Sequence, residues 1–391
     1  MTLLPHPGAS HLVLALLILG GGTAYGQTQT PGQITQFDPS LNVVDSVITQ
    51  TPSGNIGIGT ATPVASLDVA TGDLNVAGNI LKSGALFLHN FGFANTFLGQ
   101  NAGNLSMTGI QNTGSGFGAL RVNTTGAVNT ASGYNALGLN TTGVYNTAYG
   151  ALALANNSEG GENTASGLEA LFMNTTGVQN TASGAFALYQ NESGGANTAT
   201  GSDALAGNTT GELNTGSGYW ALLHNQTGTN NTAIGAFADV SVADLTNATA
   251  IGYGAVVDAS NKIRLGNTGV TVIEGQVPYT FTSDRNQKER FHPVDGEQVL
   301  RKIAGLNLTS WNYKGHDSQQ FRHYGPVAQE FFAAFGHDGV GTVGTPTTIN
   351  SGDLEGILMI AVQALDSQNR ELRTRIEALE RLVKGTAAGV Q

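Results

Sequence analysis

The sequence predicts a mainly β protein, a repetitive β-solenoid or β-roll fibre followed by a small α+β domain that ends in a coiled-coil helix. The first observation is composition: 55 of 391 residues are Gly and only 11% are charged, which suits neither helical bundles nor ordinary globular surfaces. The second is a 17-residue repeat in the middle of the chain. The third is a switch in composition, because Pro is absent between Pro63 and Pro278 and returns afterwards.

Composition also excludes several classes of protein. The chain has no Cys, so disulfide scaffolds and cysteine-ligated metal sites are ruled out. Collagen is also excluded, because the sequence lacks a strict Gly-X-Y period. The net charge is −11, and before residue 283 only Lys82, Arg121, Lys262 and Arg264 are basic. This acidic region has no electrostatic footprint for nucleic acid. No metal motif or phosphate loop is present, so we expect no cofactor.

Residues 1–26 are predicted to be a secretory signal peptide. Leu12–Leu19 form an apolar stretch, and Ala24-Tyr25-Gly26 fits a small-x-small cleavage site. The front of the segment lacks Lys and Arg, which leaves a mis-assigned start or a disordered tail as alternatives. The apolar run is too short to span a bilayer, and no other stretch could do so; the sequence predicts no transmembrane span. We therefore expect an exported product.

The next two segments precede the repeats. Residues 27–50 show no pattern and are predicted to be a flexible lead. Residues 51–94 are predicted to form short β segments, because Leu67-Asp68-Val69 and Leu74-Asn75-Val76 alternate in polarity.

Residues 95–261 repeat the pattern N-T-A-x-G-x-x-A-L-x-x-N-x-T/S-G-x-x. The Asn-Thr pairs begin at residues 95, 112, 129, 146, 163, 180, 197, 214 and 231. Such self-similarity predicts a solenoid in which each coil buries its apolar face only against its neighbours. Ala and Leu should form a thin apolar column, and Asn and Thr should form ladders of side-chain hydrogen bonds. Because this core is thin, we expect a trimer or another oligomer.

Two further features of the repeat have alternative interpretations. The bulky variable positions are predicted to fill core or inter-chain contacts rather than a ligand site; they are Tyr134, Tyr145, Leu171, Phe172, Tyr219 and Trp220. Asn-x-Thr/Ser triplets begin at Asn123, Asn140, Asn174, Asn191, Asn208 and Asn225. They match glycan acceptors, but turn chemistry repeated with the coil explains them better.

The C-terminal part divides into a connector (262–282), a small domain (283–352) and a coiled-coil helix with its tail (353–391). Val299, Leu300, Ile303 and Leu306 predict one helix face, followed by a strand over 308–313 and a strand or turn entering a helix over 322–336. A heptad seam follows, through Leu358, Val362, Leu365, Asn369, Leu372, Ile376, Leu379 and Val383. Its residue types favour a dimer in isolated peptides, whereas the whole chain favours a trimer.

Ser283 and Lys288 are the candidate catalytic residues. A Ser nucleophile needs a base, and Lys can serve once its ammonium is desolvated. Five residues apart, the two can meet in a turn or at a helix start. By spacing alone, a Ser-Asp helix cap remains the alternative.

Several segments resemble known families. The repeats of about 95–260 resemble the heads of trimeric autotransporter-type adhesins, which form left-handed β-rolls, although the longer period leaves the handedness open. Residues 54–80 resemble β segments of phage tail fibres. Residues 283–391 resemble the self-cleaving intramolecular chaperone of endosialidase-type tail spikes, also found in myelin regulatory factor. The matching positions are Ser283, Asp284, Lys288, Trp311, Tyr313, Lys314, Gly325, Ala328, Gln329 and Glu330. Pro326 departs from the aliphatic residue usual in the family.

The chaperone resemblance implies a Ser–Lys dyad that cuts the Thr282–Ser283 bond after three chains have assembled. Ser283 would be the nucleophile and Lys288 the general base. Asp284, Gly325, Gln329 and Glu330 would be supporting residues, with no metal or cofactor involved. His323 is interpreted as a packing residue rather than a catalytic helper.

The leading functional interpretation is a secreted or cell-surface fibre, or a virion tail fibre if prophage-derived, matured by an intramolecular serine autopeptidase without turnover of external substrates. Its partners would be itself, as a homotrimer, and a cell-surface glycan or matrix ligand. The first alternative is an uncleaved fibre whose C-terminal domain only trimerises. The second is a polysaccharide-degrading enzyme, which the lack of a recurrent acid pair in the repeats disfavours.

Overall fold

The structure, a computed structural model, describes residues 33–37, 43–58, 60, 62–69, 78–276 and 282–388. Two predictions lie outside these residues: the signal peptide of 1–26 and the strand expected around Leu74-Asn75-Val76. The chain divides into two units, Met1–His89 and Asn90–Gln391, each described by itself.

The first unit contains two small β arrangements. They are β1 (Gln33–Phe37), β2 (Val43–Gln50), β3 (Ile56–Ile58) and β4 (Leu67–Val69) in one sheet, and β5 (Ile80–Lys82) with β6 (Ala85–His89) as an antiparallel pair. β1 and β2 lie within 27–50, where the sequence predicted a flexible lead. The β-branched residues of β2 suit a strand, and their antiparallel partner β1 stabilises it.

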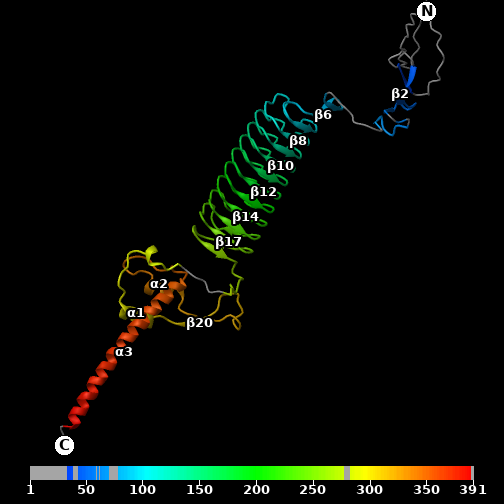
Figure 1. The fold of residues 1–391 in the computed structure, drawn as a ribbon. Helices are drawn as coiled ribbons and strands as arrows, with labels where there is room; N and C mark the ends of the chain where they lie inside the picture. The colour runs from blue at the N-terminus through cyan, green and yellow to red at the C-terminus, as the bar shows by residue number, and fades with distance from the viewer. Residues whose placement is uncertain are drawn as a thin grey trace, which may run out of the picture. The chain divides into compact units, whose positions relative to one another are not determined.

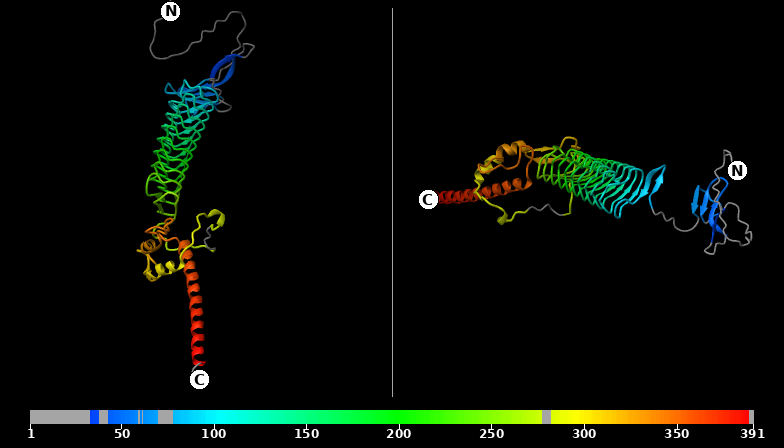
Figure 2. Two further views of the ribbon diagram at one scale, coloured as in Figure 1. Left: turned by 90° about the vertical axis from the view of Figure 1, so that its left-hand side faces the viewer. Right: turned by 90° about the horizontal axis from the view of Figure 1, so that it is seen from above.

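The second unit begins with a parallel β-solenoid that has one short strand per coil (Figures 1 and 2). Its strands are β7 (Thr96–Leu98), β8 (Thr113–Ser115), β9 (Thr130–Ser132), β10 (Thr147–Tyr149), β11 (Thr164–Ser166), β12 (Thr181–Ser183), β13 (Thr198–Thr200), β14 (Thr215–Ser217), β15 (Thr232–Ile234), β17 (Thr249–Ile251) and β19 (Ile263–Leu265). Neighbouring strands pair one repeat apart, as Ala148 pairs with Ala165. At the later coils β16 (Asp239–Val240) and β18 (Val256–Val257) add a second parallel pair. The predicted solenoid is confirmed.

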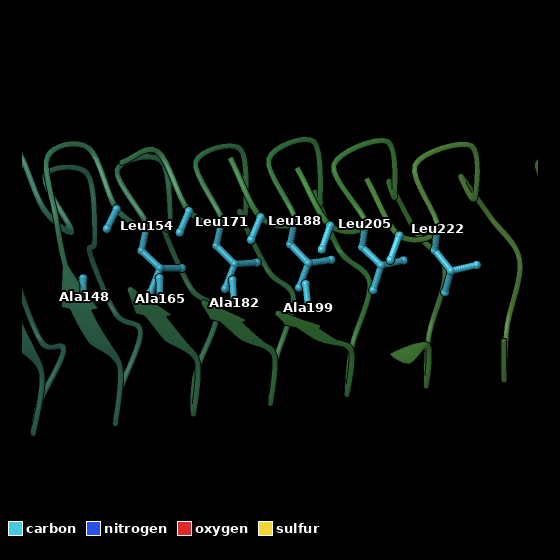
Figure 3. Packing of buried hydrophobic residues seen from close by; sticks show 14 of the residues in the cluster. Ala148, Leu154, Ala165, Leu171, Ala182, Leu188, Ala199, Leu205 and Leu222 are labelled. Carbon is cyan, nitrogen blue, oxygen red and sulfur yellow. The ribbon is translucent and has the colours of Figure 1, made fainter. Parts of the chain in front are cut away.

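The consensus Ala and Leu residues fill the inside of the coils. Figure 3 shows Leu154, Leu171 and Leu188 stacked above Ala148 and Ala165, and all five side chains are 0% exposed. The placement of Leu171 among the variable bulky residues was wrong, because this residue occupies the consensus Leu position. Tyr134 and Tyr145 lie instead on the surface, at 53% and 60% exposure.

Buried Asn side chains form the predicted ladders. Asn163 Nδ2 donates to Asn146 Oδ1 at 3.1 Å and to the Gly177 carbonyl at 2.8 Å, while the backbone N–H of Asn180 donates to Asn163 Oδ1 at 3.0 Å. These bonds pair amide groups that would otherwise be costly to bury. A second fully buried ladder runs through Asn123, Asn140, Asn157, Asn174, Asn191, Asn208 and Asn225. Turn and ladder chemistry thus accounts for the Asn-x-Thr/Ser triplets, whose Asn side chains are inaccessible in the folded coil.

The C-terminal region is α+β. Its elements are η1 (Arg285–Gln287), α1 (Gly296–Ala304), β20 (Thr309–Trp311), β21 (His323–Gly325), α2 (Ala328–Phe335) and α3 (Ser351–Ala388). Val299 of α1, Phe331 and Phe335 of α2, and Ala361 of α3 form its buried core. The helices and strands predicted from the sequence are therefore present. Among the described residues, no helix is long and apolar enough to cross a membrane.

Candidate active site

The segment after Thr282 folds back on itself. The Asp284 carboxylate caps the short helix η1 by accepting a hydrogen bond from the Asn286 backbone N–H at 2.9 Å. The turn is tightened further by the Lys288 N–H, which donates to the Arg285 carbonyl at 3.2 Å. As a result, Lys288 Nζ donates to Ser283 Oγ at 2.6 Å. The two residues singled out from the sequence are therefore in direct contact.

This segment is open to solvent in the single chain. Ser283, Asp284 and Lys288 are all exposed. The Arg285 guanidinium lies 4.9 Å from the centre of the Phe291 ring, a contact that sequence reasoning missed because neither residue belongs to a recognisable motif. A Lys amine becomes a base when its ammonium is removed from water. The contact between Ser283 and Lys288 is thus present in the single chain. Removal of the Lys288 amine from water would require a surface outside this segment.

Comparison with known proteins identifies this region. Residues 283–339 match the family model of the chaperone of endosialidase. The match begins at the serine of the Ser–Lys contact and includes η1, α1, β20, β21 and α2. No curated protein and no solved structure matches the chain. A chaperone region that follows a β-solenoid fits a tail-fibre-like protein.

The other predicted site residues lie elsewhere in the chaperone region. Gly325 ends β21 with φ of +147°, a backbone conformation that residues other than Gly rarely adopt. Gln329 is exposed near the start of α2, and Glu330 is half-buried beside it. Among the described residues, no hydrogen bond or ion pair joins Gly325, Gln329 or Glu330 to the Ser–Lys contact. The structure therefore brings together Ser283, Asp284 and Lys288, and leaves these three apart.

An aromatic cluster occupies β20 and β21 of the chaperone region. His323 stacks on Trp311 with ring centres 4.7 Å apart, and its ring meets Tyr313 edge-on at 5.5 Å. His323 is thus a packing residue, as expected. Trp311 Nε1, His316 Nδ1 and Glu330 Oε2 are buried without a hydrogen-bond partner.

Proposed function

We propose that the chain is an exported, trimeric, tail-fibre-type protein whose C-terminal chaperone region drives assembly and then cleaves itself off at Thr282–Ser283. The observation that carries this proposal is the 2.6 Å hydrogen bond between Lys288 Nζ and Ser283 Oγ, located at the first residue of the family match. The activity would be confined to one self-cleavage, with no external substrate.

The chemistry follows from the position of Ser283 next to the bond that breaks. Lys288, as a neutral amine, takes the hydroxyl proton while Ser283 Oγ attacks the carbonyl carbon of Thr282. The C–N bond between Thr282 and Ser283 breaks, the carbonyl carbon becomes esterified to Oγ, and the Ser283 nitrogen receives a proton. Water then hydrolyses the ester, which leaves a carboxylate on Thr282 and restores the hydroxyl. Asp284 acts as a positioning residue by holding the turn.

Solvent exposure would couple this step to assembly. In the single chain Lys288 is exposed to water. Packing of further chains around the turn would exclude water and favour the neutral amine. Cleavage would then follow assembly rather than precede it.

Helix α3 supplies a surface for that assembly. Its heptad side chains Leu365, Leu372, Ile376 and Leu379 are between 47% and 61% exposed in the single chain. An apolar seam of this kind is typical of a coiled coil and is buried when chains associate. Asn369 at an a position favours a dimer in simple coiled coils, so the stoichiometry is a point that the experiments must measure.

Release of the chaperone would leave a fibre without the element that assembled it. Such a product is kinetically stable because the route back to unfolded chains has been removed. Its outward role would be binding to a cell-surface glycan or matrix component, either at a bacterial surface or on a virion tail.

Intact mass and denaturing gels of the full chain test this proposal, with Ser283→Ala, Lys288→Ala and the exposed neighbour Glu289→Ala as matched variants. Wild type and Glu289→Ala should each give one product ending at Thr282 and one beginning at Ser283. Ser283→Ala and Lys288→Ala should stay whole. If the assembled wild type stays whole, the dyad is inactive and the C-terminal region is an uncleaved trimerisation foot.

A further inference from the structure

The run of consensus Leu residues stops at one coil, where the sequence has an acidic residue at that position. Leu188, Leu205 and Leu222 occupy the same position in successive coils and are 0% exposed. One repeat later this position holds Asp239, which is 7% exposed. A further coil covers it, since β16 pairs with β18 at Val256–Val257. The buried core continues at these coils through Val240 and Val257, and the Asp239 side chain lines a surface pocket instead.

This carboxylate holds one imidazole in place. His224 Nδ1 lies 2.6 Å from Asp239 Oδ2, and the Val240 backbone N–H donates to Asp239 Oδ1 at 2.8 Å. The His224 side chain is 72% exposed. With Nδ1 engaged by the carboxylate, Nε2 is the ring nitrogen left to meet a ligand. Burial raises the pKa of Asp239, and the hydrogen bond from His224 opposes that effect.

Two aromatic side chains, Trp220 and Phe237, line the same pocket as the imidazole and belong to a row of exposed rings. Tyr219 and Trp220 stack with centres 5.2 Å apart, and Phe237 meets both edge-on at 5.4 and 5.6 Å. Tyr253 extends the row, 5.7 Å from Phe237. These rings are exposed by 38% to 67%, which is a large apolar area for a solvent-facing surface. Trp220, Phe237, His224 and Asp239 line a cavity of about 400 Å³.

We propose that this cavity, termed here the coil pocket, binds a hexopyranose unit of a glycan, stacked on Trp220 and hydrogen-bonded through a hydroxyl to His224 Nε2. A pyranose has an apolar C–H face that matches an aromatic ring and hydroxyls that match a fixed imidazole. Asp239 is the positioning residue that orients His224. The proposal rests on the fibre function above. It specifies the class of ligand that the fibre binds and the coil at which it binds.

The coil pocket is a local feature of the solenoid rather than a repeated one. The pocket does not recur: the positions of Trp220 and His224 hold Asp203 and Gly207 in the preceding coil. Its combination of a buried carboxylate, an oriented imidazole and aromatic rings occurs at a single coil, as expected for a discrete ligand.

The test uses the full chain on an array of hexose and N-acetylhexosamine oligosaccharides, followed by calorimetry with the strongest binder. The variants are Trp220→Ala, His224→Ala and Tyr253→Ala. Tyr253 is 67% exposed and lies outside the core, so its removal should leave folding unchanged. Tyr189→Ala is the control, since Tyr189 stacks on Phe172 elsewhere on the solenoid. Circular dichroism checks that each variant is folded.

Wild type should bind, Trp220→Ala and His224→Ala should weaken binding at least about tenfold, and Tyr189→Ala should leave it unchanged within about twofold. Absence of wild-type binding, or equal binding by all variants, overturns the proposal. A change in assembly mass caused by Trp220→Ala or Tyr253→Ala also overturns it, by assigning the surface to contacts between copies. Gels of the same samples report cleavage separately, so failure of the ligand proposal and failure of the maturation proposal are distinguishable.

Discussion

Asp284 accepts a 2.9 Å hydrogen bond from the backbone N–H of Asn286, and this contact closes the turn that places Lys288 Nζ 2.6 Å from Ser283 Oγ. The carboxylate touches neither reacting atom. The Asp284 side chain instead stabilises the short helix η1, which Ser283 precedes and Lys288 follows in the chain.

The first prediction is that Asp284→Ala slows cleavage without abolishing it. Loss of a capping side chain makes the turn less populated, and an effect of about fivefold on the rate is expected. Asp284→Asn keeps an acceptor oxygen and should cleave near the wild-type rate. Time courses on denaturing gels measure both variants. Complete loss of cleavage in Asp284→Asn would show that the negative charge itself takes part.

The second prediction concerns the column of Leu side chains. Leu171→Ala opens a cavity at a position that is 0% exposed, and it should lower the free energy of unfolding by about 2–5 kcal/mol. Leu168→Ala, in the same coil but at a position 45% exposed, should have a much smaller effect. Denaturant unfolding in the uncleaved Ser283→Ala background measures the difference. Equal effects of the two substitutions would contradict the assignment of Leu171 to the core.

The third prediction concerns the Asn ladders. Asn163→Ala leaves the buried Asn180 N–H without its acceptor, at a cost of about 1–3 kcal/mol, whereas the Gly177 carbonyl keeps a hydrogen bond from Asn174 Nδ2. Asn156→Ala, at a half-buried position outside both ladders, is the matched control and should cost less. The same unfolding measurement applies. An unchanged free energy of unfolding in Asn163→Ala would mean that water replaces the hydrogen bonds of the ladder at no cost.

Much of the fold could be predicted because the repeat fixes it. Each coil places Ala148 or its equivalent against the next Ala, so the spacing of the Asn-Thr pairs specifies strand pairing directly. Strand β1 could not be predicted in this way, since its pairing with β2 is antiparallel and follows no repeat. Leu171 belongs to the core because it stands at the consensus Leu position of the coil that begins at Asn163.

The candidate site was only partly predictable. Spacing and resemblance were sufficient to pair Ser283 with Lys288, because five residues of turn can bring two side chains together. Their exposure depends on packing that no local pattern encodes. Asp239 carried a readable signal, an acidic residue at the consensus Leu position, but its meaning required the structure, which places His224 next to it.

The fourth prediction concerns pH. Burial raises the pKa of Asp239, so the folded chain keeps the carboxyl proton to a higher pH than the unfolded chain does. Stability from this group should therefore fall as pH rises from the ordinary Asp value of 3.8 through the raised value. Over that pH range the unfolding free energy of wild type should therefore fall relative to that of Asp239→Asn. A difference that is constant with pH would contradict the prediction.

The fifth prediction couples assembly to cleavage. Leu372→Glu places a charge in the heptad seam of α3 and should shift the chain toward monomers, measured by light scattering after size-exclusion chromatography. Thr374→Glu adds the same charge on the opposite side of the helix and should leave the assembly mass unchanged.

If assembly supplies the desolvation that Lys288 lacks in the single chain, the Leu372→Glu monomer should also remain uncut while Thr374→Glu is cleaved. A monomer that cleaves at the wild-type rate would show that the dyad works alone. The measured mass of uncleaved Ser283→Ala decides the stoichiometry as well: three chain masses support the trimer, and two would show that Asn369 and the β-branched a positions set a dimer.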